Sequence, residues 1–421
     1  MLQTPYTTTM ISMCNFLCVL QLTLCFSLTH GPTIGDLTAH SVRLSLRTEI
    51  ADRVPISLAT YDGKIVRHCA VHTRSDRDNT GYVKITNLLP DTRYSYSIDG
   101  MANDAWWFKT RPVLDKTCRI AFGSCADEGE GSSSVWRRIE ADQPTALVLL
   151  GDTPYIDTTD LKIQRTRYQI FSEVPAFASL VSHTPLYSTW DDHDFGRNDT
   201  DGNLIGKENS RQAFLEYRPN PSFGKNAEGI YTSFKQGPVE VFLLDTRWFS
   251  RTQVSVNGIP TLLGKKQWAW LERSLKASTS PYKVLACGII FNNATRPGKT
   301  DYWGGYPTEY LRLLSIIKRN AISGVLLISG DIHWSRVIRH ETADTIGYDL
   351  HEFITSPIHE KLIPAADAPH RGLVYSVGEP NSYLLLETKD HEIDSSIILS
   401  LRNAKGDTLH SFVYPRPPSA D

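Results

Sequence analysis

The 421-residue sequence lacks the features that mark several large classes of protein. It contains no polybasic run, and its formal net charge of -2 gives the chain as a whole no attraction to nucleic acid or to an acidic membrane. It has no GxxxxGK[ST] phosphate loop. The hydrophobic fraction of 41% and the charged fraction of 21% are typical of a globular protein. The length predicts two or three domains.

Cysteine is scarce and scattered, with seven residues and no CxxC pair. This spacing favours neither a zinc knuckle nor a disulfide framework. Three cysteines fall before residue 26; the other four are Cys69, Cys118, Cys125 and Cys287.

The N-terminus contains an apolar stretch, residues 11–28, that has the length of a signal-peptide core and is short for a membrane span. We therefore expect residues 1–28 to be a leader and the mature chain to be secreted, periplasmic or on the cell surface, without a transmembrane span. No Lys or Arg precedes Arg43, so the basic region of a signal peptide is missing. A buried first strand or a misplaced start codon, and with it a cytoplasmic protein, stays open.

Residues 29–112 are predicted to form a small β-sandwich domain. Residues 37–48, 54–62 and 80–100 alternate apolar and polar side chains at the period of a strand. The segment Leu88–Tyr94 resembles the tyrosine corner of fibronectin type III sandwiches, in which a Tyr hydroxyl ties a loop to the backbone.

Residues 113–421 are predicted to form a second, α/β domain. Short apolar runs at 118–122, 145–150, 239–244, 282–290 and 324–329 are typical of strands buried on both faces. Amphipathic stretches at 133–141, 165–174, 265–275 and 308–320 predict helices between them. Residues 382–415 return to period two and predict antiparallel strands at the edge of the same domain. Residues 179–188 also read as strand-forming.

Polar residues of the kinds that bind metals follow four of these strands. They are Cys125; Asp152 and Tyr155; Asp191, Asp192, His193 and Asn198; and Asp331 and His333. Each alone has an ordinary structural explanation, such as a turn, a cap or a buried cysteine. Because ligands in α/β sheets gather beyond the carboxyl ends of strands, four such ends together predict a metal site.

Two other chemistries fit less well. A cysteine phosphatase needs an Arg six residues after Cys125, where Gly131 stands. An EF-hand beginning at Asp199 would need Gly and Glu where Leu204 and Ser210 stand.

The motifs FGSC (122–125), LGDTPY (150–155), WDDHDFGRND (190–199) and SGDIH (329–333) resemble, in this order, the alkaline phosphatase D (PhoD-like) family of metallophosphoesterases. The resemblance extends from His30 to near the C-terminus. It implies an α/β fold, the metallophosphoesterase four-layer αββα sandwich, preceded by a small all-β, fibronectin III-like domain.

The resemblance also implies the metals and their ligands. Ferric iron would be held by Cys125, Asp152, Tyr155 and His333. Calcium would be held by Asp152 as a bridging ligand together with Asp192, Asn198 and Asp331. Which of Asp191, Asp192 and Asn198 bind stays open, as does replacement of these metals by zinc or manganese.

The implied activity is that of a phosphoesterase, hydrolysing small phosphomonoesters or phosphodiesters with a metal-activated hydroxide at a dinuclear or trinuclear site. His193 and Asp192 are the expected catalytic residues, with His193 hydrogen-bonding the phosphate or protonating the leaving group. The protein is expected to be a monomer. The alternative function is a secreted or cell-surface binding protein with a structural calcium site. One departure is that residues 287–290 read Cys-Gly-Ile-Ile where many relatives carry Ser-Gly-Ile-Gln.

Overall fold

A computed structural model describes residues 27–252, 258, 260–388 and 396–417. Most of the expected leader therefore lies outside the described residues. Within the described part of the chain, no helix has both the length and the apolar character needed to cross a membrane.

The N-terminal strands form two antiparallel sheets that face each other around a shared apolar core. The three-stranded sheet has the order β1 (Leu28–Gly35), β2 (Val42–Thr48), β5 (Thr80–Ile85). The four-stranded sheet has the order β4 (Ile65–His72), β3 (Arg53–Thr60), β6 (Arg93–Ile98), β7 (Met101–Lys109). Every second residue of β2 is buried, which confirms the period-two prediction.

The predicted tyrosine corner is confirmed. The Tyr94 hydroxyl accepts a hydrogen bond from the Leu89 backbone N–H at 2.9 Å. Its neighbour on the same face, Tyr96, donates to the Ser182 carbonyl oxygen at 2.6 Å. This second bond ties the β-sandwich to a helix of the α/β region.

The α/β region contains two mixed sheets. The six-stranded sheet has the order β10 (Leu186–Thr189), β9 (Ala146–Leu150), β8 (Arg119–Gly123), β18 (Ser382–Thr388), β19 (Ile397–Asn403), β20 (Thr408–Tyr414). The seven-stranded sheet has the order β11 (Thr232–Gln236), β12 (Val239–Leu243), β13 (Tyr282–Ala286), β14 (Val325–Ser329), β16 (Leu350–Ile354), β15 (Ser335–His340), β17 (Leu373–Val377). The C-terminal strands join the first sheet through pairing of β18 with β8.

The helices flank these sheets. The α-helices are α1 (Glu130–Ala141), α2 (Leu161–Ser172), α3 (Pro175–His183), α4 (Asp192–Phe195), α5 (Lys207–Tyr217), α6 (Gly264–Ala277), α7 (Pro307–Arg319) and α8 (Ala343–Ile346). Three short 3-10 helices span Ser75–Arg77, Trp303–Gly305 and Pro364–Ala366. The stretch 179–188 predicted as strand contains the end of α3, so that prediction was wrong for residues 179–183.

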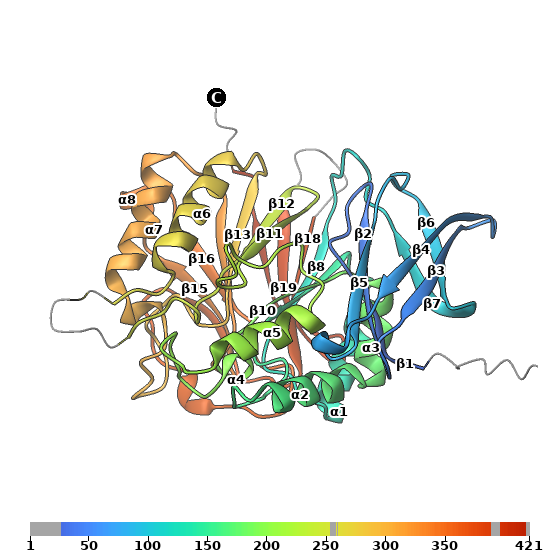
Figure 1. Cartoon of the computed structure of the whole chain (residues 1–421). Coiled ribbons are helices and arrows are strands. Elements are labelled where there is room, and N and C mark those ends of the chain that lie inside the picture. The colour runs from blue at the N-terminus through green and yellow to red at the C-terminus, as the bar shows by residue number, and fades with distance from the viewer. Residues whose placement is uncertain (1–26, 253–257, 259, 389–395, 418–421) are drawn as a thin grey trace, which may run out of the picture.

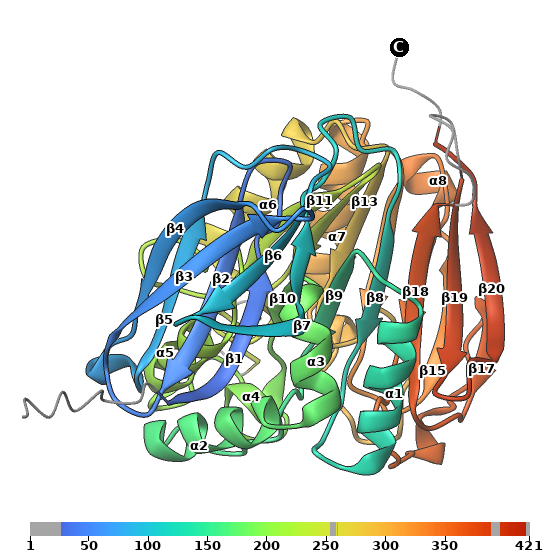
Figure 2. The same cartoon turned by 90° about the vertical axis from the view of Figure 1, so that its right-hand side faces the viewer.

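The layers follow from which side chains each apolar core contains. Between the two sheets, Ile120 and Val148 of the first pack with Val241, Val284 and Leu326 of the second. A second core joins α6 and α7 to the outer face of the seven-stranded sheet, and a third joins α1 and α3 to the outer face of the six-stranded sheet. Figure 1 shows α6 and α7 on one side and the N-terminal strands at the other end of the molecule, and Figure 2 shows α1 and α3 in front of β8 and β9. The arrangement is the predicted αββα sandwich.

Candidate metal centre

The side chains predicted from strand ends meet beyond the carboxyl ends of β8, β9, β10 and β14. Backbone hydrogen bonds join the loops that follow β8 and β9, because Cys125 N–H donates to the Gly151 oxygen at 3.2 Å and Ala126 N–H to the Asp152 oxygen at 3.0 Å. Ligand atoms of Cys125, Asp152 and His333 lie within 4.8 Å of one another. Parallel strands thus deliver polar residues from distant parts of the sequence to one place.

This first cluster has the donor atoms and the burial of a metal site. The Cys125 sulfur lies 3.6 Å from Asp152 Oδ2, and the Tyr155 hydroxyl oxygen lies 3.0 Å from His333 Nε2. Burial raises the pKa of the Cys125 thiol well above its usual value and lowers the pKa of His333 to about 3. His333 Nδ1 is buried, and no described residue hydrogen-bonds to it. A cation would convert these groups into favourable ligands, since a thiolate or phenolate in such surroundings needs a nearby positive charge.

His359 belongs to this cluster and was not predicted. Its Nε2 lies 3.0 Å from the Tyr155 hydroxyl oxygen, and its ring meets that of His333 edge-on with centroids 4.6 Å apart. His359 N–H donates to the Cys125 carbonyl oxygen at 3.0 Å, which fixes its backbone to the β8 loop. His359 follows the strand β16. A metal-binding residue after a strand was the signal that predicted the other members of the cluster, so the same signal could have identified His359.

The backbone at the cluster has an uncommon conformation. Cys125, Asp152, Asp331 and His333 have φ angles of 57°, 53°, 69° and 52°, in the left-handed region that non-glycine residues seldom adopt. Such conformations persist where the surroundings impose them, and they concentrate at functional sites. Gly151, at φ 104°, allows the loop after β9 to lie close to the backbone of Asp191. A Cβ at Gly151 would be only 2.4 Å from the Asp191 backbone nitrogen.

The four aspartates of the stretch TWDDHDFGRND divide into different roles. Asp194 accepts the Asp191 N–H at 2.6 Å, which forms one half of a capping box at α4. Asp191 accepts from Arg247 Nε at 2.7 Å. Asp192 has a ligand atom within 4.8 Å of those of Asp152 and His193. The stretch therefore combines a helix cap, a buried ion pair and a carboxylate of the cluster.

The end of that stretch differs from the expectation for Asn198. Asn198 is exposed, and no described residue hydrogen-bonds to its side chain. The next residue, Asp199, instead has a carboxylate oxygen within 4.8 Å of those of Asp192 and Asp301. The structure thus places Asp199 and Asp301, which were not predicted, beside Asp192.

His193 lies at the open side of the centre. Its Nδ1 is 2.6 Å from Asp157 Oδ1, and its side chain is 21% exposed. The Tyr155 ring packs on the imidazole with centroids 4.7 Å apart. The Ile156 and Asp157 N–H groups both donate to the His193 carbonyl oxygen at 3.0 Å. The imidazole is thereby oriented through Nδ1, and no described residue hydrogen-bonds to Nε2.

Two buried cations complete the surroundings of the centre. Arg247, from LLDTR, pairs with Asp191 and, at 2.6 Å, with Asp301. Lys299 Nζ donates to Asp331 Oδ1 at 2.9 Å and to Asp199 Oδ1 at 3.0 Å. Burial alone would raise the pKa of Asp192, yet Arg247 and Lys299 outweigh it and lower that pKa. The same cations only partly offset burial at Asp191, Asp301 and Asp331, where burial raises the pKa.

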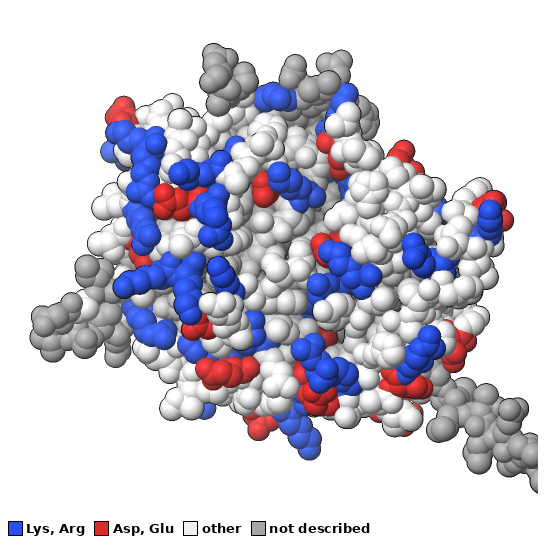
Figure 3. Space-filling view, turned by 45° about the horizontal axis from the view of Figure 1, so that its top comes forward, with Lys and Arg blue, Asp and Glu red and all other residues white. Residues whose placement is uncertain are grey.

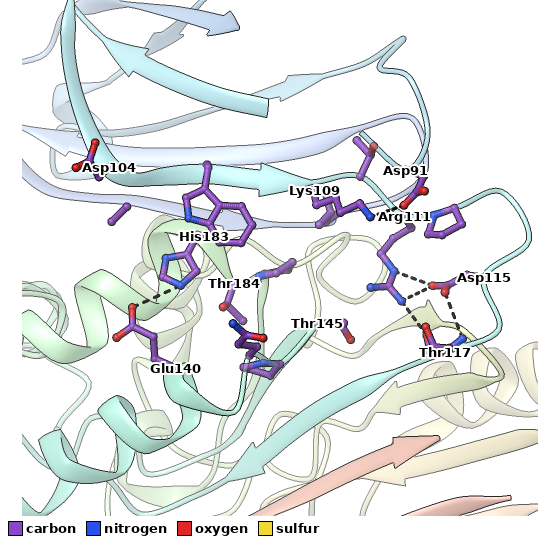
Figure 4. Close-up of a pocket in the computed structure, with 18 residues that line it drawn as sticks. Asp91, Asp104, Lys109, Arg111, Asp115, Thr117, Glu140, Thr145, His183 and Thr184 are labelled. Atoms are coloured by element: carbon purple, nitrogen blue, oxygen red, sulfur yellow. Dashed lines mark hydrogen bonds and ion pairs between the residues drawn. The ribbon is translucent and has the colours of Figure 1, made fainter. Parts of the chain in front are cut away.

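A hollow of about 840 Å³ lies elsewhere, at the junction of the β-sandwich and the α/β region (Figure 4). In it the Trp107 ring stacks on His183 with centroids 5.2 Å apart, and Arg111 pairs with Asp115. None of the predicted site residues lines this hollow. On the face shown in Figure 3, Lys and Arg side chains are interspersed with Asp and Glu.

Comparison with known proteins agrees with this geometry. The sequence profile of the family described as PhoD-like phosphatase matches residues 120–382. Alkaline phosphatase D of Bacillus subtilis (strain 168) is 24% identical over 328 residues, which are 65% of this chain and 56% of that protein. The chain therefore matches little more than half the length of that relative. A solved structure of PhoD superposes with a TM-score of 0.76 at 20% identity, covering 94% of this chain and 92% of the other, and shows that the fold is shared.

Proposed function

Because the chain belongs to the PhoD-like phosphatase family, we propose that it is a metal-dependent phosphoesterase that hydrolyses small phosphate esters. The observation that carries the proposal is the buried cluster of Cys125, Asp152 and His333, with ligand atoms within 4.8 Å of one another beside the Tyr155 hydroxyl. Phosphomonoesters are the first substrates to test, and phosphodiesters the second.

We propose that Cys125, Asp152, Tyr155 and His333 hold ferric iron, with His359 close enough to join them. Thiolate, carboxylate, phenolate and imidazole together suit a transition metal, and zinc or manganese is the alternative. The metal would supply Lewis acidity to the phosphoryl group. The buried, unbonded Nδ1 of His333 supports this fit.

The proposed roles of the remaining residues follow from their contacts. The partly exposed His193 side chain would hydrogen-bond the phosphate through Nε2 or donate a proton to the leaving oxygen. Asp157 would keep the proton on His193 Nδ1, because its carboxylate oxygen lies 2.6 Å away. Asp192 would orient the α4 turn, since its carboxylate accepts the His193 N–H at 3.0 Å and the Asp199 N–H at 2.7 Å.

The residues expected to hold calcium have the oxygen atoms that calcium prefers, but their contacts and exposure do not favour binding of that ion. Asp331 accepts a hydrogen bond from Lys299, and Asn198 is exposed.

We also propose that residues 29–112 and 113–421 are separate domains and that the protein is an exported monomer.

The test combines metal analysis with hydrolysis of mono- and bis-(p-nitrophenyl) phosphate, each with and without chelator. Asp152→Asn should abolish turnover and lower the metal content. Asp99→Asn is the matched control. It is the same substitution at a residue with a similar φ angle, 48°, but in an exposed turn. Metal without turnover on any ester would favour the alternative, a binding protein whose metal is structural.

A further inference from the structure

The Lys299 ammonium lies among three carboxylates, one of which, Asp331, is expected to bind the second metal ion. The side chain is 1% exposed, and it lies in the loop between β13 and α7. Its Nζ is 2.9 Å from Asp331 Oδ1, 3.0 Å from Asp199 Oδ1 and 3.9 Å from Asp301 Oδ2. These carboxylates come from three separate loops, so the ammonium joins segments that are distant in the sequence.

Two of these carboxylates, Asp199 and Asp301, also belong to a group spaced as the ligands of one cation would be. Oxygens of Asp192, Asp199 and Asp301 lie within 4.8 Å of one another. Calcium binds carboxylate oxygens at about 2.3–2.6 Å, which is shorter than the hydrogen bonds that Lys299 makes. A calcium ion bound to Asp331 Oδ1 and Asp199 Oδ1 together would therefore compete with the Lys299 nitrogen for the same two oxygens.

Displacement of that nitrogen is unfavourable for two reasons. The side chain is almost fully buried, so an expelled ammonium has no route to water without movement of the surrounding loop. Arg247 already occupies the other side of the group, 2.6 Å from Asp301 Oδ2 and 3.9 Å from Asp192 Oδ2. Two fixed positive charges thus neutralise carboxylates that would otherwise repel one another.

We propose that Lys299 replaces the second metal ion, so that the chain holds one metal at the Cys125, Asp152 and His333 cluster and no calcium beside it. The proposal rests on the proposed metal centre but not on the identity of the substrate. Lys299 is a positioning residue, because it is buried and acts through Asp331 and Asp199. It holds these loops in place without an external ion, so activity is independent of calcium supply.

The experiment measures metal content by mass spectrometry and calcium or terbium uptake by titration, on wild type and on Lys299→Met. Wild type is expected to hold one metal per chain and to show no calcium uptake at this site. Lys299→Met is expected to gain a second metal, with luminescence from bound terbium and a Tm that calcium raises. The calcium-selective chelator EGTA is expected to leave wild-type activity unchanged.

Two controls separate the possible causes. Lys283→Met removes another buried lysine, whose Nζ donates to the Ser280 and Ser323 carbonyl oxygens far from the centre, and it should gain no metal. Cys125→Ala should lose the first metal in either background. Together they distinguish a general effect of removing a buried charge from the creation of a cation site.

The outcomes are distinguishable. Wild type with a stoichiometric calcium ion, or a folded Lys299→Met that takes up no second cation, would overturn the replacement while leaving the phosphoesterase proposal intact. Wild type without any metal and without turnover would contradict the proposed function itself. If Lys299→Met does not fold, the metal count and calcium titration of wild type still decide the matter.

Discussion

Removing the charge of Asp157 should slow turnover by a predictable amount, because this carboxylate orients His193. Asp157→Asn retains an oxygen that can accept from Nδ1 but loses the charge. A hydrogen bond to a charged partner contributes about 1.5–3 kcal/mol and a neutral one about 0.5–1.5 kcal/mol, so the difference is about 1 kcal/mol. At about 1.4 kcal/mol per tenfold, this corresponds to a loss of about fivefold in kcat. Asp157 is 55% exposed, and solvent screening makes this an upper value.

The expected order of variants tests the mechanism. Asp157→Ala should lose about tenfold, since the whole hydrogen bond disappears. His193→Ala should lose about 10²–10⁴-fold, the range for a general acid. The decrease in kcat should be large with an alkyl phosphate and small with p-nitrophenyl phosphate, because nitrophenolate leaves without needing a proton.

The assay is kcat for each variant on both esters, with metal content measured in parallel as the control. Equal losses on the two esters would show that His193 binds the phosphate instead of protonating the leaving group. A His193→Ala effect without any Asp157→Asn or Asp157→Ala effect would refute the positioning role of Asp157.

Three further predictions concern stability, each measured by urea unfolding. Arg247→Met should destabilise the protein by about 3–5 kcal/mol, because it leaves buried carboxylates without their cation. Burial raises the pKa of Glu352, but hydrogen bonds, first that from His340, outweigh it and place this pKa below its unfolded value. The stability it contributes is therefore full above about pH 4.5 and is lost as the pH falls through the folded pKa, so Glu352→Gln should flatten the acid dependence. Tyr96→Phe should cost about 1–3 kcal/mol, because it leaves the buried Ser182 oxygen without its donor.

Each of these has a contradicting result. An Arg247→Met protein as stable as wild type would mean that the buried carboxylates are protonated or bind another cation. An unchanged acid dependence in Glu352→Gln would assign the acid sensitivity to other carboxylates. A neutral Tyr96→Phe would show that water replaces the lost donor.

Much of the site was predictable because its residues follow strands that are easy to recognise. Apolar runs such as that of β9 are buried at every position and leave little doubt about where the strand ends. Asp152 and Asp331 stand two residues past such ends, so their meeting follows from the geometry of a parallel sheet.

The parts that were missed lack such a signal. Lys299 and Asp301 come from an irregular loop, whose path no periodic pattern predicts. The strand β4 lacks a clear alternation of apolar and polar side chains. It is an edge strand, and most of its side chains are at least partly exposed. The apolar run at 179–183 fits either a short strand or a helix, and the start of α3 at Pro175 was the local sign of a helix.

The position of β8 in its sheet has a consequence for biosynthesis. One neighbour of β8 is β9, formed soon afterwards, but the other is β18, where Leu384 pairs with Phe122. The strand that carries the Cys125 loop therefore gains its second neighbour only after β18 has left the ribosome, and pairing across so long a separation is slow. The proposed metal would then be acquired only after this pairing, so the supply of metal in the compartment where folding finishes would set how much protein holds it.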